Sequence, residues 1–157
     1  MNPEQRARRL ARIAEVSALM AEAARVEALR RQDEQRKSEA KLQLIQRYNG
    51  EYSLLSTARE AEATSVAAIL SHRSFAGWLG QLADQQQEDL VRAVALTERA
   101  LAEATAKRIH ARSLGAVAAK ARQSARKEAE RREQRQLDDL SSSSSAQAGI
   151  DIARGWY

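Results

Sequence analysis

The side chains that could take part in catalysis are spread along this sequence without any catalytic spacing. His72 and His110 lie far apart, and neither belongs to a metal-ligand motif such as HExxH. The chain has no cysteine, which excludes a thiolate nucleophile, a thiolate metal site and a disulfide. Its carboxylates alternate with Arg and Lys at helical spacing, which is typical of a solvated helix face. We therefore expect no enzyme activity, no metal, no cofactor and no small-molecule ligand.

A basic stretch late in the chain could contact phosphates; it contains Arg122, Arg126, Lys127, Arg131, Arg132 and Arg135. Glu128, Glu130 and Glu133 interrupt it and would repel a nucleic-acid backbone. No aromatic residue lies among these charges to stack on bases. We expect no nucleic-acid partner; a nucleic-acid-binding helical hairpin stays the alternative, and steeply salt-dependent affinity would reveal it.

The composition favours long helices over a globule. Leu, Ile, Val and Phe account for 29 of the 157 residues, too few to fill a compact core. Ala, Glu, Arg, Gln and Leu dominate, and these are strong helix formers. No apolar run approaches 18 residues, so we expect no membrane span. The start of the sequence has no apolar segment typical of a secretory signal.

The first helix is predicted over about residues 3–62, roughly 90 Å at 1.5 Å per residue. Asn2 can cap it, and Pro3 suits the first helical position. Its apolar residues fall in two stretches that flank a charged segment, 30–41, in which Glu27–Arg31 and Asp33–Lys37 pairs can support the helix. The two stretches are Leu10, Ile13, Met20 and Ala24, then Leu42, Ile45, Tyr48, Tyr52 and Leu55.

The chain is predicted to reverse within residues 63–73, where the charge pattern is lost. A second helix follows over about 74–140, with Ser71 or Ser74 as its cap. One continuous helix is the rival interpretation, because no Gly or Pro marks the turn. Residues 141–157 begin with five serines and are predicted to form a flexible tail.

Two thin apolar stripes predict that the helices pair, because most helical stability comes from packing. The expected fold is all-α, a long antiparallel two-helix coiled coil with a flexible C-terminal tail. A reversal near residue 68 places opposite each other residues whose numbers sum to about 136, so Leu10 would meet Arg126. The predicted packing residues are Leu42, Ile45, Tyr48, Tyr52, Leu55, Leu90 and Val94.

The same pairing brings two basic segments to one end. Residues 1–12 carry four Arg and one Glu, and residues 120–136 carry seven basic and three acidic residues. The net charges of +3 and +4 predict a strongly positive tip that favours an acidic partner.

Three segments, in order, resemble the FliJ family of flagellar type III export proteins. Glu39–Tyr52 is similar to that family's leucine-rich turn with a Tyr-x-x-Glu-Tyr element, here Tyr48, Glu51 and Tyr52. Phe75–Gln87 resembles the Phe-x-x-x-Leu segment with its trailing glutamines. Arg126–Leu140 resembles the charged ending with a Leu-Asp-Asp triplet at 137–139. The resemblance covers residues 5 to about 140.

This resemblance implies a non-enzymatic, stalk-like coiled coil that links the export ATPase hexamer to the export-gate membrane protein and handles export chaperones. It implies a cytoplasmic location, peripheral to the inner face of the membrane at the flagellar base. The ATPase-facing residues would be Arg8, Arg9, Arg12, Arg122, Arg126, Arg131, Arg135 and Leu137. The gate-facing residues would be Phe75, Leu79, Leu82 and Gln86.

Two alternatives share the predicted architecture. The injectisome counterpart of the family serves virulence secretion, and the Tyr48–Tyr52 element favours the flagellar system over it. A homotypic coiled-coil spacer is the purely structural alternative. An exposed Phe75–Leu79 patch would favour gate docking, because an apolar strip on a helical surface usually binds a partner.

Overall fold

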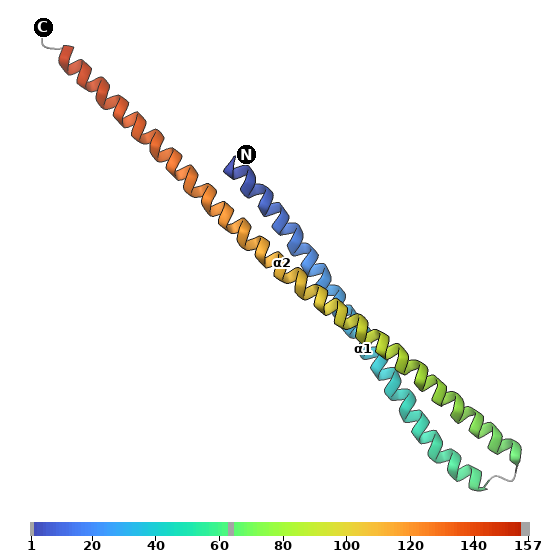
Figure 1. The fold of residues 1–157 in the computed structure, drawn as a ribbon. Coiled ribbons are helices and arrows are strands. Elements are labelled where there is room, and N and C mark those ends of the chain that lie inside the picture. The colour runs from blue at the N-terminus through green and yellow to red at the C-terminus, as the bar shows by residue number, and fades with distance from the viewer. Residues whose placement is uncertain (1, 63–64, 155–157) are drawn as a thin grey trace. The chain divides into compact units, whose positions relative to one another are not determined.

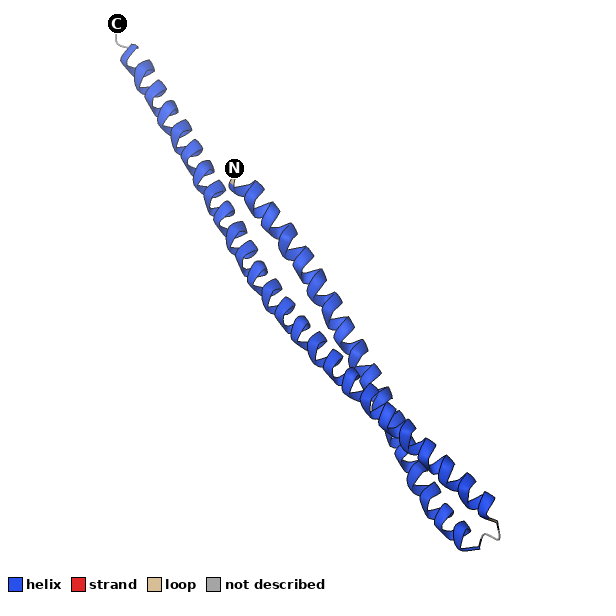
Figure 2. Ribbon diagram, turned by 45° about the vertical axis from the view of Figure 1, so that its right-hand side comes forward, coloured by secondary structure: helices blue, strands red, loops and turns tan. Residues whose placement is uncertain are grey.

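The computed structural model describes the backbone of residues 2–62 and 65–154, and the side chains of these residues except residue 60 and those from 142 onward. Two helices make up this part of the chain, α1 (Pro3–Glu62) and α2 (Val66–Arg154) (Figure 1). No strand occurs among the described residues (Figure 2). The predicted fold class is confirmed: the protein is all-α, with two long helices packed against each other.

Local interactions hold α1 as its sequence indicates. Asn2 caps the helix, because its Oδ1 accepts a hydrogen bond from the Glu4 amide at 3.2 Å. In the charged segment, Glu27 pairs with Arg31 at 2.8 Å and Asp33 pairs with Lys37 at 2.6 Å. Each exposed pair of this kind contributes little on its own, because solvent screens its charges. Such pairs support helix where the large apolar residues are missing.

The hydrogen bond from Lys37 lowers the pKa of Asp33 below its ordinary value, with the Lys37 charge as the second cause. Because the pKa of Asp33 is lowered in the folded chain, the pair's contribution is present above the unfolded pKa of Asp33. The contribution is lost as the pH falls through the folded value. Arg25 acts on Glu22 in the same way, first through its hydrogen bond. Acid therefore weakens α1 within its charged stretch.

The chain divides into two units. One, called here the terminal unit, contains Met1–Leu19 and Ile109–Tyr157. The other, the turn unit, contains Met20–Arg108. Each unit holds a part of α1 and a part of α2 that run in opposite directions (Figure 1).

In the turn unit, three polar contacts define how α1 and α2 face each other. Tyr52 Oη lies 2.8 Å from His72 Nδ1, and the Gln86 amide donates to Ser38 Oγ at 2.8 Å; in both pairs the residue numbers sum to 124. Thr97 Oγ1 donates to the backbone carbonyl of Arg31 at 3.1 Å, a pair that sums to 128. The helices are therefore antiparallel within this unit.

The predicted register near 136 is wrong, as is the placement of the turn over 63–73. The register differs because α2 begins at Val66, so that residues 66–73 are helical and the connection is short. Residues 63–64 of the predicted turn lie outside the described residues. The expected caps Ser71 and Ser74 lie inside α2. With a shorter turn, each α1 residue of the turn unit that makes these contacts faces a position about ten residues earlier in α2 than predicted.

Small residues form most of the interface between the helices. We call this interface the seam; its positions recur at alternating steps of three and four residues, and all are buried or half-buried. In the turn unit the α1 seam runs through Ala21, Ala24, Ala28, Arg31, Gln35, Ser38, Leu42, Ile45, Asn49, Tyr52 and Ser56. On α2 it runs through Ile69, His72, Ala76, Leu79, Ala83, Gln86, Leu90, Ala93, Thr97, Ala100, Ala104 and Lys107.

The terminal unit continues the same spacing with even smaller side chains. Its seam consists of Pro3, Ala7, Leu10, Ala14 and Ser17 on α1, and of Ala111, Leu114, Ala118, Ala121 and Ala125 on α2. Ala118 is 1% exposed and Ala7 is 5% exposed. Large apolar residues, such as Ile13 and Val117 in this unit, are half-exposed beside the seam. Close approach of the two backbones, which only small residues permit, therefore replaces interlocking of large side chains.

The second helix continues past its predicted end. We expected α2 to stop at about residue 140, before the serine run, but it extends to Arg154. Ser141 Oγ donates to the backbone carbonyl of Asp138 at 2.9 Å, a bond that lets a serine remain in a helix. Residues 155–157 of the predicted tail lie outside the described residues, and the flexibility of the tail stays a prediction.

The seam predicts that Ala118→Leu destabilises the protein. The added carbons have no room between the helices, and overpacking of this kind costs ~1–3 kcal/mol. Ala119→Leu is the matched control, because Ala119 is exposed on the same turn of α2 and its replacement should change stability by less than ~0.5 kcal/mol. Urea unfolding followed by circular dichroism measures both; equal stability of the two variants would contradict the seam.

Candidate partner-binding surfaces

Aromatic residues gather on one side of the turn unit. The ring of Tyr52, which is half-buried in the seam, meets the ring of Phe75 edge to face with centroids 4.7 Å apart. Phe75 in turn stacks on Trp78 with centroids 5.5 Å apart. Phe75 is 44% exposed and Trp78 is 53% exposed. The contacts fix the orientation of two large rings whose outer faces remain open to a partner.

Apolar residues of α1 extend this surface. Tyr48, Leu55, Phe75 and Leu82 each directly precede a seam residue, and in an antiparallel coiled coil such positions on the two helices lie on the same side of the seam. Leu44 and Trp78 lie four residues before Tyr48 and Leu82, and so on the same helix faces. We call this surface the aromatic edge: Leu44, Tyr48, Leu55, Phe75, Trp78 and Leu82.

The four residues expected to face the export gate separate into two groups. Phe75 is exposed and Leu82 is half-buried, and both belong to the aromatic edge. Leu79 is only 7% exposed, within the seam. Gln86 is half-buried, and its amide is bonded to Ser38. The structure thus places Leu79 and Gln86 between the helices, where they position the surface and do not form it.

Sequence reasoning missed Trp78, Tyr48 and Leu44 as surface residues. Trp78 has a signal in the sequence, since it follows Phe75 by three residues and so shares its helix face. Tyr48 was assigned to coiled-coil packing together with Leu55, but these side chains are 55% and 58% exposed. The other predicted packing residues are inside or beside the seam: Leu42 is buried, and Ile45, Tyr52, Leu90 and Val94 are half-buried.

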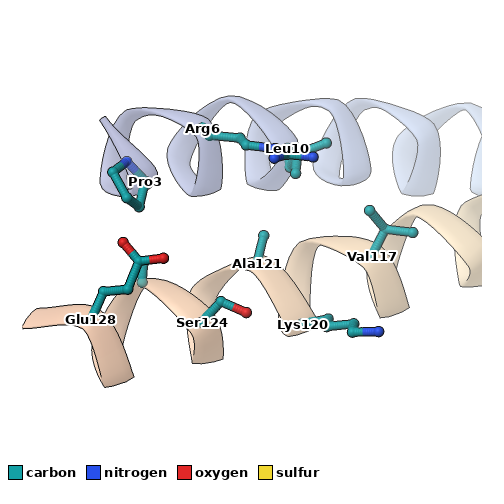
Figure 3. Close-up of a pocket in the computed structure, with 9 residues that line it drawn as sticks. Pro3, Arg6, Leu10, Val117, Lys120, Ala121, Ser124 and Glu128 are labelled. Carbon is teal, nitrogen blue, oxygen red and sulfur yellow. The ribbon is translucent and has the colours of Figure 1, made fainter. Parts of the chain in front are cut away.

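The terminal unit contains an open groove between α1 and α2. Figure 3 shows Pro3 and Leu10 of α1 pointing toward α2, whereas the side chain of Arg6 runs along α1. The groove measures about 350 Å³, and its α2 wall consists of Val117, Lys120, Ala121, Ser124, Ala125 and Glu128. It lies at the surface, since only Ala125 among its lining residues is buried. Arg6 and Lys120 bring positive charge to the lining, and Glu128 brings a negative charge.

This groove also corrects the predicted pairing of Leu10 with Arg126. Leu10 lies with Val117 and Ala121, which precede Arg126 in α2 by nine and five residues (Figure 3). The partner of the first α1 turn is the segment 124–128, so α2 extends past the start of α1. Residues 130–141 are all exposed. The basic residues Arg131 and Arg135 therefore lie on a part of α2 that α1 does not cover.

Each residue expected to face the ATPase lies in the terminal unit and is exposed: Arg8, Arg9, Arg12, Arg122, Arg126, Arg131, Arg135 and Leu137. The side chain of Arg8 is 81% exposed and lies 3.9 Å from Glu4. Leu137 is 62% exposed. Ion pairs within α2, such as Arg132 with Glu128 at 3.8 Å, partly offset the positive charge.

Charge is distributed unequally between the units. The terminal unit contains 13 of the 26 basic and 8 of the 21 acidic residues, and the turn unit contains 13 of each. The whole net charge of +5 therefore belongs to the terminal unit. Within the described part of the chain, no three His, Asp or Glu residues are grouped as a metal site would require. In that same part, neither helix has a stretch apolar enough to cross a membrane.

The described part of the chain is thus an antiparallel helix pair with a basic unit, a neutral unit and an exposed aromatic surface, which is the architecture of a two-helix coiled coil. A family model described as Flagellar FliJ protein matches residues 5–149. The chain therefore belongs to the FliJ family, whose members are non-catalytic components of the flagellar type III export apparatus. Comparisons with curated proteins and with solved structures gave no match.

The burial of Leu79 predicts that its replacement destabilises the protein more than the same replacement at an exposed leucine. Leu79→Ala should lower the free energy of unfolding by ~2–3 kcal/mol, because it removes a buried side chain from the seam. Leu70→Ala makes the same chemical change at a side chain that is 61% exposed, and should cost less than ~1 kcal/mol. Chemical denaturation measures the difference. Equal losses would place Leu79 on the surface and contradict its assignment to the seam.

Proposed function

We propose that this chain couples the export ATPase hexamer to the export-gate membrane protein during flagellum assembly, as a stalk-like, non-catalytic component. The observation that carries the proposal is the separation of surface chemistry between the units. The terminal unit presents positive charge, and the turn unit presents an apolar aromatic edge. Two different surfaces on one chain suit a protein that binds two different partners.

The terminal unit is the proposed ATPase-binding part. Its excess positive charge attracts an acidic surface and accelerates encounter with it. The groove beside Leu10 combines an apolar lining with Arg6, Lys120 and Glu128, which suits a partner segment that has an apolar side chain between charged neighbours. The exposed segment 130–141 adds Arg131, Arg135 and Leu137 as contacts that α1 does not cover.

The aromatic edge is the proposed gate-binding surface. Phe75 and Trp78 supply large rings of defined orientation, and such residues dominate the binding energy of many interfaces. In this proposal Leu79 and Gln86 act indirectly, by fixing the position of α2 against α1. Tyr48 and Leu44 add a contribution from α1 to a site that was expected on α2 alone.

The remaining parts of the proposal follow from family membership. The protein would act in the cytoplasm, peripherally associated with the inner face of the membrane at the flagellar base, and would also bind export chaperones. The alternative is that the chain uses the same two surfaces in an injectisome, the virulence type III secretion system. Nucleic-acid binding gains no support from the structure, because Glu128 and the other glutamates stay interleaved with the basic residues of α2.

The proposal predicts that the purified chain stimulates ATP hydrolysis by its cognate export ATPase, and that Arg126→Glu combined with Arg131→Glu reduces the stimulation several-fold. The double replacement reverses two charges on the exposed basic face of α2. Arg99→Glu with Arg108→Glu is the control, since it changes the net charge equally but lies in the neutral turn unit. Absence of stimulation by the wild type, or equal loss in both variants, would contradict the proposal.

A further inference from the structure

We propose that two copies of this chain pair face to face through their aromatic edges, forming a short four-helix bundle from two turn units. The pairing covers the surface that the proposed gate protein would bind, so free protein is held in a self-associated form. The competition between the second copy and the gate rests on the function proposed above. The pairing itself does not.

The amount of exposed apolar surface calls for a partner. Tyr48, Phe75 and Trp78 are each about half exposed, and Leu44 and Leu55 are 44% and 58% exposed. An aromatic side chain can bury ~150–250 Å², so the edge leaves on the order of 500 Å² of apolar surface open on each copy. Two copies then bury on the order of 1,000 Å², the lower limit for a specific and reversible interface.

The spacing of these residues fits a second copy of the same hairpin. Along 44–56 and 69–83, apolar residues occupy the seam positions Ile45, Tyr52 and Leu79 and also the position directly before a seam residue. Apolar residues at three of seven helical positions are typical of helices in bundles, whereas a two-helix coil needs only two. A second turn unit supplies two helices with the same spacing of apolar residues. Because the two copies are related by a two-fold axis, each uses the same surface to bind the other.

The opposite side of the hairpin explains why the assembly would stop at two copies. Gly50, Gly77 and Gly80 each directly follow a seam residue, which places them on the side away from the aromatic edge. An added Cβ at any of the three would meet no atom within 4 Å, so the surface around these glycines is open. Exposed apolar residues on this side, such as Leu70 and Val91, are isolated, whereas those of the aromatic edge are contiguous. A two-fold pairing through the edge therefore closes and does not continue into a fibre.

Charge favours contact between two turn units over contact between two terminal units. The turn unit contains 13 basic and 13 acidic residues, so two of them approach without net repulsion. The terminal unit holds the whole excess of +5, and two such units repel each other. The apolar surface therefore lies on the part of the chain whose charge permits self-association.

Sedimentation of the full chain over a range from low micromolar to several hundred micromolar tests the proposal. We expect a concentration-dependent equilibrium between monomer and dimer, and a dimer weakened about tenfold or more by Trp78→Glu. Leu54→Glu is the matched control, because Leu54 is 77% exposed but does not belong to the aromatic edge. A chain that stays monomeric at every concentration, or a dimer that both variants weaken equally, overturns the proposal.

Cysteine cross-linking is a second test. Because the chain has no native cysteine, a single cysteine can be introduced without removing any other. Tyr48→Cys should form a disulfide between copies under mild oxidation. Ser53→Cys, exposed on the other side of α1, should not. Equal cross-linking at both positions overturns the pairing.

The two proposals fail in different experiments. If the gate's cytoplasmic domain competes with the second copy, adding it to the dimer should yield a complex that contains one copy of the chain. A dimer that persists with the gate domain bound would overturn the competition. Loss of stimulation in the wild type would count against the proposed function and leave the sedimentation result valid.

Discussion

The close contact of α1 and α2 through small side chains is the constraint on which the other features depend. The hydroxyl of Thr97 reaches the backbone carbonyl of Arg31, which requires the two helices to lie close together. Ala28 and Ala118 are almost fully buried at such contacts. A buried methyl contributes only ~0.8 kcal/mol, less than half of what a buried leucine can provide. The helices are thus held by many weak contacts and a few register-specific hydrogen bonds.

This seam leaves large apolar residues available for other partners. If Tyr48, Leu55 and Phe75 filled the interface, the turn unit would have no apolar surface to offer. Because smaller residues occupy the seam positions that follow these three, the aromatic edge stays exposed and Leu79 fixes its position from beneath. In the terminal unit the groove beside Leu10 is lined in part by seam alanines. Both proposed binding surfaces lie beside a seam made of small residues.

Much of the fold could be predicted from the sequence, because it depends on local features. The cap at Asn2 and the Asp33–Lys37 pair need no knowledge of the partner helix. The register could not be predicted, because it depends on where the chain turns, and no Gly or Pro marks the start of α2 at Val66. Tyr48 and Asn49 illustrate the error at the seam: apolar size favours Tyr48, but the observed spacing places Asn49 inside.

The candidate sites were predictable to a similar extent. The basic residues of the terminal unit are exposed as expected, since charged side chains rarely lie between helices. Which of the expected gate residues are exposed and which are buried depends on the seam, and it could not be predicted from Phe75 and its neighbours alone.

One measurement tests the seam most directly: disulfide formation in the variant Ser38→Cys/Gln86→Cys, compared with Ser38→Cys/Glu98→Cys. The structure predicts rapid closure of the 38–86 pair and none of the 38–98 pair. Preferential closure of the 38–98 pair would contradict the register, and with it the position of every seam residue.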